Sequence, residues 1–403
     1  MRPVIKISCC IVALIALLVA GSANADWQSD LEAQFDIVET FDGLSDWPFS
    51  YGFAFGIGAD STVSHQPQKI GGAVSIWDSF DYQAYPDPTA DFIKDHGAAN
   101  VWRGSGKSLK MDMDQDSATA NVGPSRLRAY IGGATGGSID AYAAAGAANS
   151  GYTADVYVFE MIKIPSNIFP RTGETYDYFS YFKWFVFATG KTGVNDCDTY
   201  PCVETERTRC EYGVSNAHTM LTVNTTGKPH FKLEYYSDAD KYTDQGYCNY
   251  TGWATLLLPQ QGGVGDDFQI WIPTNAESDL TNYIPDWFGL ETHIHRGTPG
   301  VSDGYQEYWL YSSTGVVAYV GRVPTDYMMV PDGEALGFNY FFQGGNISYQ
   351  PAVDSQGLDV SYYVDDIIID NARIGPTYFG MVSGAQNHRA GGAPSGGNPS
   401  GWQ

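Results

Sequence analysis

Residues 287–296 read WFGLETHIHR, and polar and apolar side chains alternate along them. Because successive side chains of a β-strand point to opposite faces of a sheet, Glu291, His293 and His295 are predicted to share one face. Leu290 and Ile294 then share the other face, which is apolar. This pattern is typical of an antiparallel strand with one buried face. Two interpretations of the polar face remain open: a solvated edge strand, or one wall of a groove lined by imidazole, guanidinium and phenol groups.

The remainder of the chain repeats this type of pattern. Aromatic residues make up 14% of the sequence, and its 46 glycines often separate short alternating segments. Such segments, bounded by turn residues, predict a mainly β protein. We therefore predict an all-β fold, a single antiparallel β-sandwich of two sheets. The predicted strands are 37–41, 108–113, 126–131, 152–164, 178–187, 218–223, 230–236, 268–272, 288–295, 305–311, 337–342 and 362–369.

The two ends of the chain differ from the central domain. Arg2 and Lys6 precede an apolar run at 11–20, and Ala23-Asn24-Ala25 follows it, which is the pattern of a secretory signal peptide over residues 1–25. The run is too short for a membrane anchor, so we expect a secreted protein, extracellular or periplasmic, with no membrane anchor. Residues 26–383 are predicted to form the sandwich domain. The Gly/Pro/Ser-rich tail, 384–403, is predicted to be disordered.

Four of the six cysteines lie outside the signal peptide, all within one segment. They are Cys197, Cys202, Cys210 and Cys248. In an oxidising compartment they favour two disulfides, for which three pairings exist. A zinc site is the alternative, although the spacing lacks C-x-x-C pairs. Residues 195–250 are thus predicted to be a disulfide-stapled loop insertion in the sheet domain.

The charge of the chain excludes some partners. There are 46 acidic and 22 basic residues, which give a formal net charge of −24. Nucleic acid is not expected as a partner, because phosphate binding needs a basic surface, and an anionic membrane is equally unsuited. The excess of acidic residues suits a protein that stays soluble in salt or that binds a structural divalent cation. An anionic polysaccharide remains compatible with this net charge as a substrate, if Lys, Arg and His side chains gather in one groove.

Several short motifs carry a family resemblance. Residues 39–44 (ETFDGL), 106–110 (GKSLK) and 363–367 (YVDDI) resemble concanavalin A-like jelly rolls. Within that superfamily, residues 183–185 (KWF), the turn 297–304 and residues 341–345 (FFQGG) resemble alginate and glucuronan lyases of polysaccharide lyase family 14. The likeness covers roughly residues 35–379.

This resemblance implies metal-independent β-elimination on a uronic-acid polysaccharide, with no organic cofactor. The reaction needs a group that neutralises the carboxylate, a base for the C5 proton and an acid for the leaving oxygen. The candidate catalytic residues are Lys183, His293, His295, Tyr305 and Tyr340. The candidate substrate-binding residues are Arg126, Arg128, Arg296 and Gln343.

Two non-catalytic functions are also compatible with the sequence. Tryptophans such as Trp184 and Trp287 would stack on sugars in a carbohydrate-binding or adhesive protein, unless they belong to the core. A sandwich with exposed sheet edges would suit a self-assembling structural subunit. Retaining hydrolysis is disfavoured, because the sequence lacks the Glu-x-Asp-x-x-Glu strand that would pair two carboxylates.

Acidic residues near both ends of the domain suggest a structural Ca²⁺. Glu39 and Asp42 lie near the first predicted strand, 37–41, and Asp365 and Asp366 lie on the last. If these terminal strands pair, they bring together the oxygen ligands that calcium prefers. An outward-facing Asp366 at a strand edge is the alternative.

Overall fold

The structure is a computed structural model that describes sixteen segments of the chain. They are residues 27–48, 77, 79–81, 91–112, 126–130, 152–166, 181–188, 216–223, 229–236, 279–298, 301, 303–322, 337–338, 340–344, 347–348 and 361–390. The predicted signal peptide, the predicted strand 268–272 and the four cysteines of the insertion lie outside the described residues. No helix in the described segments is long and apolar enough to cross a membrane.

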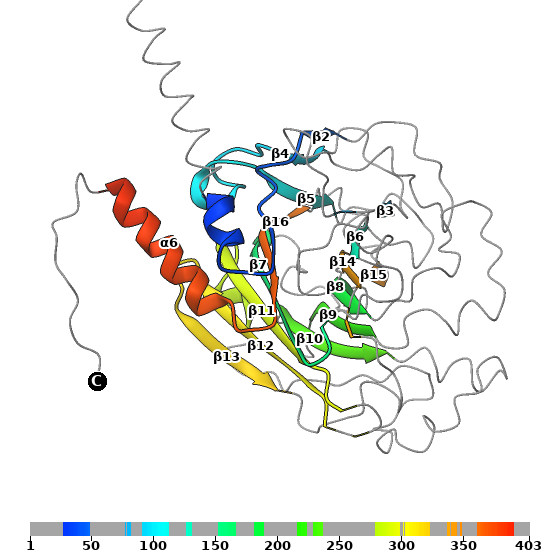
Figure 1. The fold of residues 1–403 in the computed structure, drawn as a ribbon. Helices are drawn as coiled ribbons and strands as arrows, with labels where there is room; N and C mark the ends of the chain where they lie inside the picture. Colours follow the sequence, from blue (N-terminus) through cyan, green and yellow to red (C-terminus); the bar gives the residue numbers. More distant parts are fainter. Residues whose placement is uncertain are drawn as a thin grey trace, which may run out of the picture.

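The described strands form two antiparallel sheets that face one another (Figure 1). The nine-stranded sheet has the order β13 (Val317–Arg322), β12 (Tyr305–Ser312), β11 (Trp287–His295), β7 (Asp155–Lys163), β16 (Ser361–Asp370), β5 (Ser108–Asp112), β4 (Asp91–Lys94) and β2 (Trp47–Pro48), with β1 (Ile37–Glu39) paired to β16. The seven-stranded sheet has the order β10 (Pro229–Tyr236), β9 (Asn216–Val223), β8 (Tyr181–Ala188), β14 (Tyr340–Gln343), β6 (Arg126–Tyr130) and β3 (Ser79–Asp81), with β15 (Ile347–Ser348) paired to β8. The predicted antiparallel β-sandwich is confirmed.

The main hydrophobic core lies between the sheets. Leu290 of β11 and Val364 of β16 belong to the same buried cluster as Leu221 of β9. The Trp184 ring of β8 lies 4.4 Å from the ring of Tyr362 and 5.6 Å from that of Phe231, centroid to centroid, so it contacts both sheets. The alternating apolar residues of each strand therefore face the opposite sheet, as the period of two requires.

A second core covers the outer face of the nine-stranded sheet. A helical turn at residues 27–32 and the helix α6 (Gly375–Ala390) pack there (Figure 1). Phe159 of β7 lies 4.6 Å from the Tyr378 ring of α6, and Tyr311 of β12 stacks on Phe379 at 5.4 Å. The central strands are thus buried on both faces. No helix was predicted where α6 lies, and α6 continues through Ala390 into the segment expected to be disordered from Gly384 onward.

The first and last strands of the domain pair, as the sequence suggested. Val38 of β1 is opposite Ile368 of β16 in antiparallel register. Beside this pairing, β16 carries a bulge between Asp365 and Ile368, and Asp366 has a φ of 44°. The bulge places both aspartates of the strand in buried positions.

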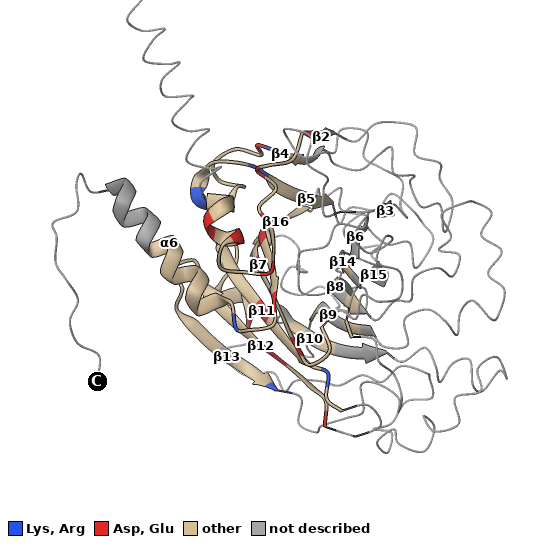
Figure 2. Ribbon diagram, in the orientation of Figure 1, with Lys and Arg blue, Asp and Glu red and all other residues tan. Residues whose placement is uncertain are grey.

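A guanidinium lies between the carboxylates for which calcium was predicted. Nη2 of Arg103 is 3.4 Å from Oδ2 of Asp42 and 3.8 Å from Oδ1 of Asp366. Trp102 N donates to Asp365 at 3.0 Å, and Tyr378 donates to Asp366. These carboxylates are among the acidic positions that lie along the central strands of the nine-stranded sheet (Figure 2). Arg103 therefore supplies positive charge among these carboxylates. The Ca²⁺ suggested by the sequence stays a prediction.

Candidate functional site

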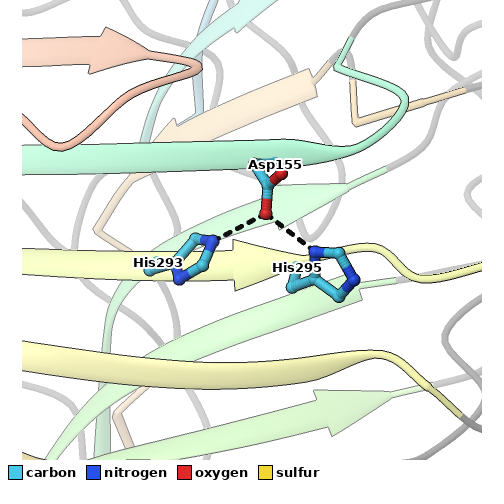
Figure 3. A group of neighbouring side chains, drawn as sticks. All are labelled: Asp155, His293 and His295. Carbon is cyan, nitrogen blue, oxygen red and sulfur yellow. Dashed lines mark hydrogen bonds and ion pairs between the residues drawn. The ribbon is translucent and has the colours of Figure 1, made fainter.

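A cluster of histidine and acidic side chains lies on the outer face of the nine-stranded sheet. The strand register sets His293 opposite Tyr157 and Glu307, and His295 opposite Asp155 and Tyr305. Asp155 Oδ1 is 2.9 Å from His293 Nε2 and 2.7 Å from His295 Nδ1 (Figure 3). One carboxylate oxygen thus bridges two imidazoles. We call Asp155, His293, His295 and Glu307 the histidine cluster.

His293 is held on both ring nitrogens. Its Nδ1 lies 2.8 Å from Glu307 Oε1, and its Nε2 faces Asp155. The ring can donate hydrogen bonds to both carboxylates only as an imidazolium, because a neutral imidazole has one N–H. The ring also stacks on Tyr157, with centroids 4.1 Å apart and planes 3° apart. His293 is therefore fixed in orientation, and its side chain is only 4% exposed.

The electrostatic balance of the cluster keeps Asp155 charged. Partial burial raises the pKa of its carboxyl, but hydrogen bonds from His295 and His293 outweigh burial and hold the pKa below its ordinary value. Burial, together with the charges of Asp155 and Glu307, raises the pKa of Tyr157 to about 12. Tyr157 therefore stays a neutral phenol beside the histidines near neutral pH.

One side of the cluster is open to solvent. The side chains of His295 and Asp155 are 30% and 37% exposed. His295 stacks on Tyr305, with ring centroids 4.7 Å apart, and the guanidinium of Arg322 lies 3.5 Å from the centroid of that same ring. The open side is therefore flanked by an aromatic ring and a cation.

The position of α6 decides which part of this face is covered. Ile374 N, just before α6, donates to the buried carboxylate of Glu291 at 2.6 Å, so the helix begins beside Glu291. A Cβ at Gly375 would lie 2.3 Å from Tyr311, so this close approach requires glycine. Glu291 shares its face with the histidines, but here it anchors the helix.

The histidine cluster also has the composition of a metal site. Among the described residues, Asp155, His293 and His295 form a trio whose ligand atoms all lie within 4.8 Å of one another. Imidazole nitrogens and a carboxylate oxygen are common ligands of zinc and related cations.

A second polar face belongs to the seven-stranded sheet. Buried Leu221, Phe231 and Phe341 define the side of β9, β10 and β14 that faces the core. By alternation, their neighbours occupy the opposite face. The positions on that face include Arg126, Arg128, Tyr340, Lys183, His218, Met220, His230 and Lys232, together with the acidic residues Asp81 and Glu234. We call this the outer face of the seven-stranded sheet.

A β-bulge places Lys183 on that outer face. The register between β8 and β9 shifts between Lys183 and Phe185, so that Trp184 is the extra residue. Trp184 and Phe185 are both fully buried. The bulge allows two consecutive side chains to enter the core and leaves Lys183 in register with Met220, on the opposite side.

The structure divides the predicted site residues between the two sheets. His293, His295 and Tyr305 lie together in or beside the histidine cluster, whereas Lys183, Tyr340, Arg126 and Arg128 belong to the outer face of the seven-stranded sheet. The two groups do not share a cleft, because the nine-stranded and seven-stranded sheets present them on opposite sides of the sandwich.

Two residues predicted to bind substrate are buried instead. Gln343 is completely buried and faces Glu160 in the core between the sheets, with its Nε2 3.5 Å from Glu160 Oε2. Arg296 is 4% exposed and donates to the carbonyl of Thr153 at 3.4 Å. Gln343 alternates with Phe342 on β14, and this alternation places it on the core side.

His218, His230 and Lys232 were not among the site residues predicted from the sequence. They lie in strands that were predicted, and they alternate there with Ala217, Phe231 and other apolar residues. The alternation was a signal sufficient to place His230 and Lys232 on one face of β10, whereas His218 joins them through the pairing of β9 with β10. The alternation did not link them to Lys183, because that link depends on the pairing of β8 with β9.

No family model matches the chain, and no curated protein matches its sequence. Among solved structures, a marine PL-14 alginate lyase from Aplysia kurodai is 9% identical, with a TM-score of 0.39 over 70% of this chain and 86% of its own. An alginate lyase from a Chlorella virus is 12% identical, with a TM-score of 0.38 over 69% and 89%. A double mutant of a third alginate lyase, in complex with an alginate tetrasaccharide, is 11% identical, with a TM-score of 0.36 over 84% and 97%. These neighbours match the resemblance noted in the sequence, but at such TM-scores the function of this chain rests on its own residues.

Proposed function

We propose that the outer face of the seven-stranded sheet binds an acidic polysaccharide and cleaves it by β-elimination. The observation that carries the proposal is the register that gathers Lys183, Arg126, Arg128 and Lys232 on one face. The same register also places two carboxylates on this face, Asp81 opposite Arg126 and Glu234 opposite His218. With four cations against two carboxylates, the described part of the face has a positive balance, whereas the chain as a whole has a net charge of −24. Such a local positive balance favours an anionic ligand.

The size and composition of this face suit a polymer. Six strands spaced about 4.8 Å apart make a face about 24 Å wide, long enough for several sugar units. Aromatic positions such as Tyr130 and Tyr340, which are opposite one another in the register, accompany the cations. Aromatic rings and cations together are the groups that recognise charged sugars.

Each step of the elimination has a candidate residue on this face. Lys183 neutralises the carboxylate attached to C5, which makes the C5 proton more acidic. His218, on the neighbouring strand β9, accepts that proton, and the electron pair of the C–H bond forms the C4=C5 double bond. The C4–O4 bond breaks, and Tyr340 supplies the proton to the leaving oxygen. The jelly-roll class with this chemistry is the one that the sequence motifs resemble.

The predicted signal peptide, residues 1–25, bears on where the reaction takes place. As a secretory signal it would deliver the chain to a compartment where polysaccharides are found and where the four cysteines of the insertion form disulfides. We therefore propose that the reaction takes place outside the cytoplasm.

The proposal predicts a large loss of activity in two variants. Lys183→Met and His218→Ala are each expected to lower kcat/KM by about 10²-fold or more, because each removes one element of the transition-state stabilisation. Activity is measured as the ultraviolet absorbance of the new C4=C5 double bond, with alginate, glucuronan, pectate and glycosaminoglycans as substrates. Alginate is included because the structural neighbours are alginate lyases.

Lys94→Met is the matched control, since Lys94 lies on β4 of the other sheet. It is expected to retain wild-type activity. The proposal fails if no polymer yields an unsaturated product, or if His295→Ala abolishes the product while Lys183→Met does not. The second outcome would assign the reaction to the histidine cluster.

A further inference from the structure

The geometry points to a binding site for a divalent transition-metal cation of the Zn²⁺ type in the histidine cluster. The ligands are His293 Nε2, His295 Nδ1 and Asp155 Oδ1. This inference is independent of the proposed function, because the cluster and the proposed catalytic face belong to different sheets.

The distances between the three ligand atoms are close to those that a metal requires. Ligand bonds of about 2.0–2.2 Å in a tetrahedral site put neighbouring ligand atoms roughly 3.3–3.5 Å apart. The observed distances from Asp155 Oδ1 are 2.9 Å to His293 Nε2 and 2.7 Å to His295 Nδ1. A modest opening of these two distances is therefore sufficient, and all three ligand atoms lie within 4.8 Å of one another. Asp155 and His295 are end residues of their strands.

Glu307 provides an independent second feature of a metal site. A metal-binding histidine usually donates its other ring N–H to a carboxylate, which fixes the tautomer and orients the lone pair. Glu307 Oε1 is 2.8 Å from His293 Nδ1, on the side of the ring away from Asp155. With Nδ1–H directed at Glu307, the Nε2 lone pair of His293 is directed at the site.

The ligand set selects the class of cation. Two imidazoles and one carboxylate suit Zn²⁺, Co²⁺, Ni²⁺ or Cu²⁺, whereas Ca²⁺ and Mg²⁺ prefer a shell of oxygens. The exposure of Asp155 and His295 leaves one side of the site accessible, so a water molecule or an exogenous ligand completes the coordination. Tyr305 and Arg322 flank this side.

The test uses the full mature chain, without an affinity tag and stripped of metal by a chelator. Isothermal titration with Zn²⁺ and elemental analysis after dialysis are expected to show one ion that is missing from the Asp155→Asn, His295→Ala double variant. Glu307→Gln keeps all three ligands and is expected to bind Zn²⁺ about 10–100-fold more weakly. Co²⁺ is expected to give visible absorption bands in the wild type that the double variant lacks.

His96→Ala is the matched control, because His96 makes an edge-to-face contact with the Tyr363 ring, away from the cluster. It is expected to bind Zn²⁺ as the wild type does. Circular dichroism checks that each variant is folded, and Glu307→Gln keeps the test decisive if the double variant is not. The inference is overturned if the wild type takes up no zinc, or if uptake is the same in wild type, double variant and Glu307→Gln. Equal uptake would assign the ion to other residues, such as the cysteines of the insertion.

Discussion

Replacing Arg103 with methionine is expected to lower the free energy of unfolding by about 3–5 kcal/mol near neutral pH, because it leaves buried carboxylates without a compensating charge. Arg103 lies between Asp42 and Asp366, and its guanidinium also covers the Trp27 ring at 4.8 Å from the centroid. Methionine fills a similar volume, so the loss reports mainly on the charge. Urea-induced unfolding, followed by circular dichroism, measures the effect.

The effect of this substitution depends on pH in a defined direction. Burial raises the pKa of Asp42 to about 6, although hydrogen bonds from Lys107 N and Arg103 act against burial. The folded state therefore binds a proton that the unfolded state releases, and stability falls as the pH rises from about 4 to about 6. Without Arg103 this fall is steeper, since the guanidinium also lowers the pKa of Asp365. The difference between variant and wild type is thus expected to shrink toward about pH 4.

Arg322→Met is the control for the loss of an arginine. Arg322 is exposed on β13, where it covers the Tyr305 ring. Arg322→Met is expected to lower the free energy of unfolding by no more than about 1 kcal/mol. A destabilisation by Arg103→Met that is equally small, or that does not change with pH, would contradict the assignment of Arg103 as the balancing charge.

Glu160→Gln is expected to stabilise the protein by a few kcal/mol above about pH 8, and by much less near pH 5. Glu160 lies in the core between the sheets, where its Oε2 accepts a hydrogen bond from Trp184 Nε1 at 2.7 Å. Burial raises the pKa of its carboxyl to about 8, and the hydrogen bonds from Trp184 and Gln343 reverse this only in part. The side chain is therefore neutral in the folded protein near pH 7.

The direction of this change in stability follows from the number of protons that the folded and unfolded states bind. Between about pH 4.5 and 8 the folded state holds a proton on Glu160 that the unfolded state has lost, so wild-type stability falls by up to about 1.4 kcal/mol per pH unit. Glutamine has no charge to bury, and its amide oxygen accepts from Trp184 as the carboxylate does. The variant should therefore lack this part of the pH dependence.

Urea unfolding at several pH values between about 5 and 9 checks this prediction. Glu32→Gln, at an exposed position of the N-terminal helical turn, serves as the control and is expected to follow the wild-type curve. Parallel curves for Glu160→Gln and the wild type would show that Glu160 does not titrate in this range.

Much of the strand content was predictable from the sequence. The predicted segments 108–113, 218–223, 230–236 and 288–295 coincide closely with β5, β9, β10 and β11. Each has alternating apolar residues, which is a local signal. β13 and the short strands β2, β3, β4 and β15 were not predicted, because two to six residues carry too little alternation.

The helix α6 shows a different limit of sequence patterns. Its sequence, GPTYFGMVSGAQNHRA, has three glycines and weak helical periodicity. The helix is held by contacts that are distant in sequence: Tyr378 packs on Phe159 and donates to Asp366. Packing of this kind outweighs intrinsic propensity, and no pattern local to residues 375–390 indicates it.

The sequence by itself determined the period-two alternation, and with it the all-β class and the sharing of one face by His293 and His295. Tertiary structure alone decided which side of the sandwich each polar face occupies. Strand pairing grouped Lys183 with His218 on one sheet and the two histidines of β11 with Asp155 on the other, and it turned Gln343 inward. The physical reason is that alternation depends only on the local backbone, whereas the partner of a strand and the layer that covers it depend on contacts between residues far apart in the chain.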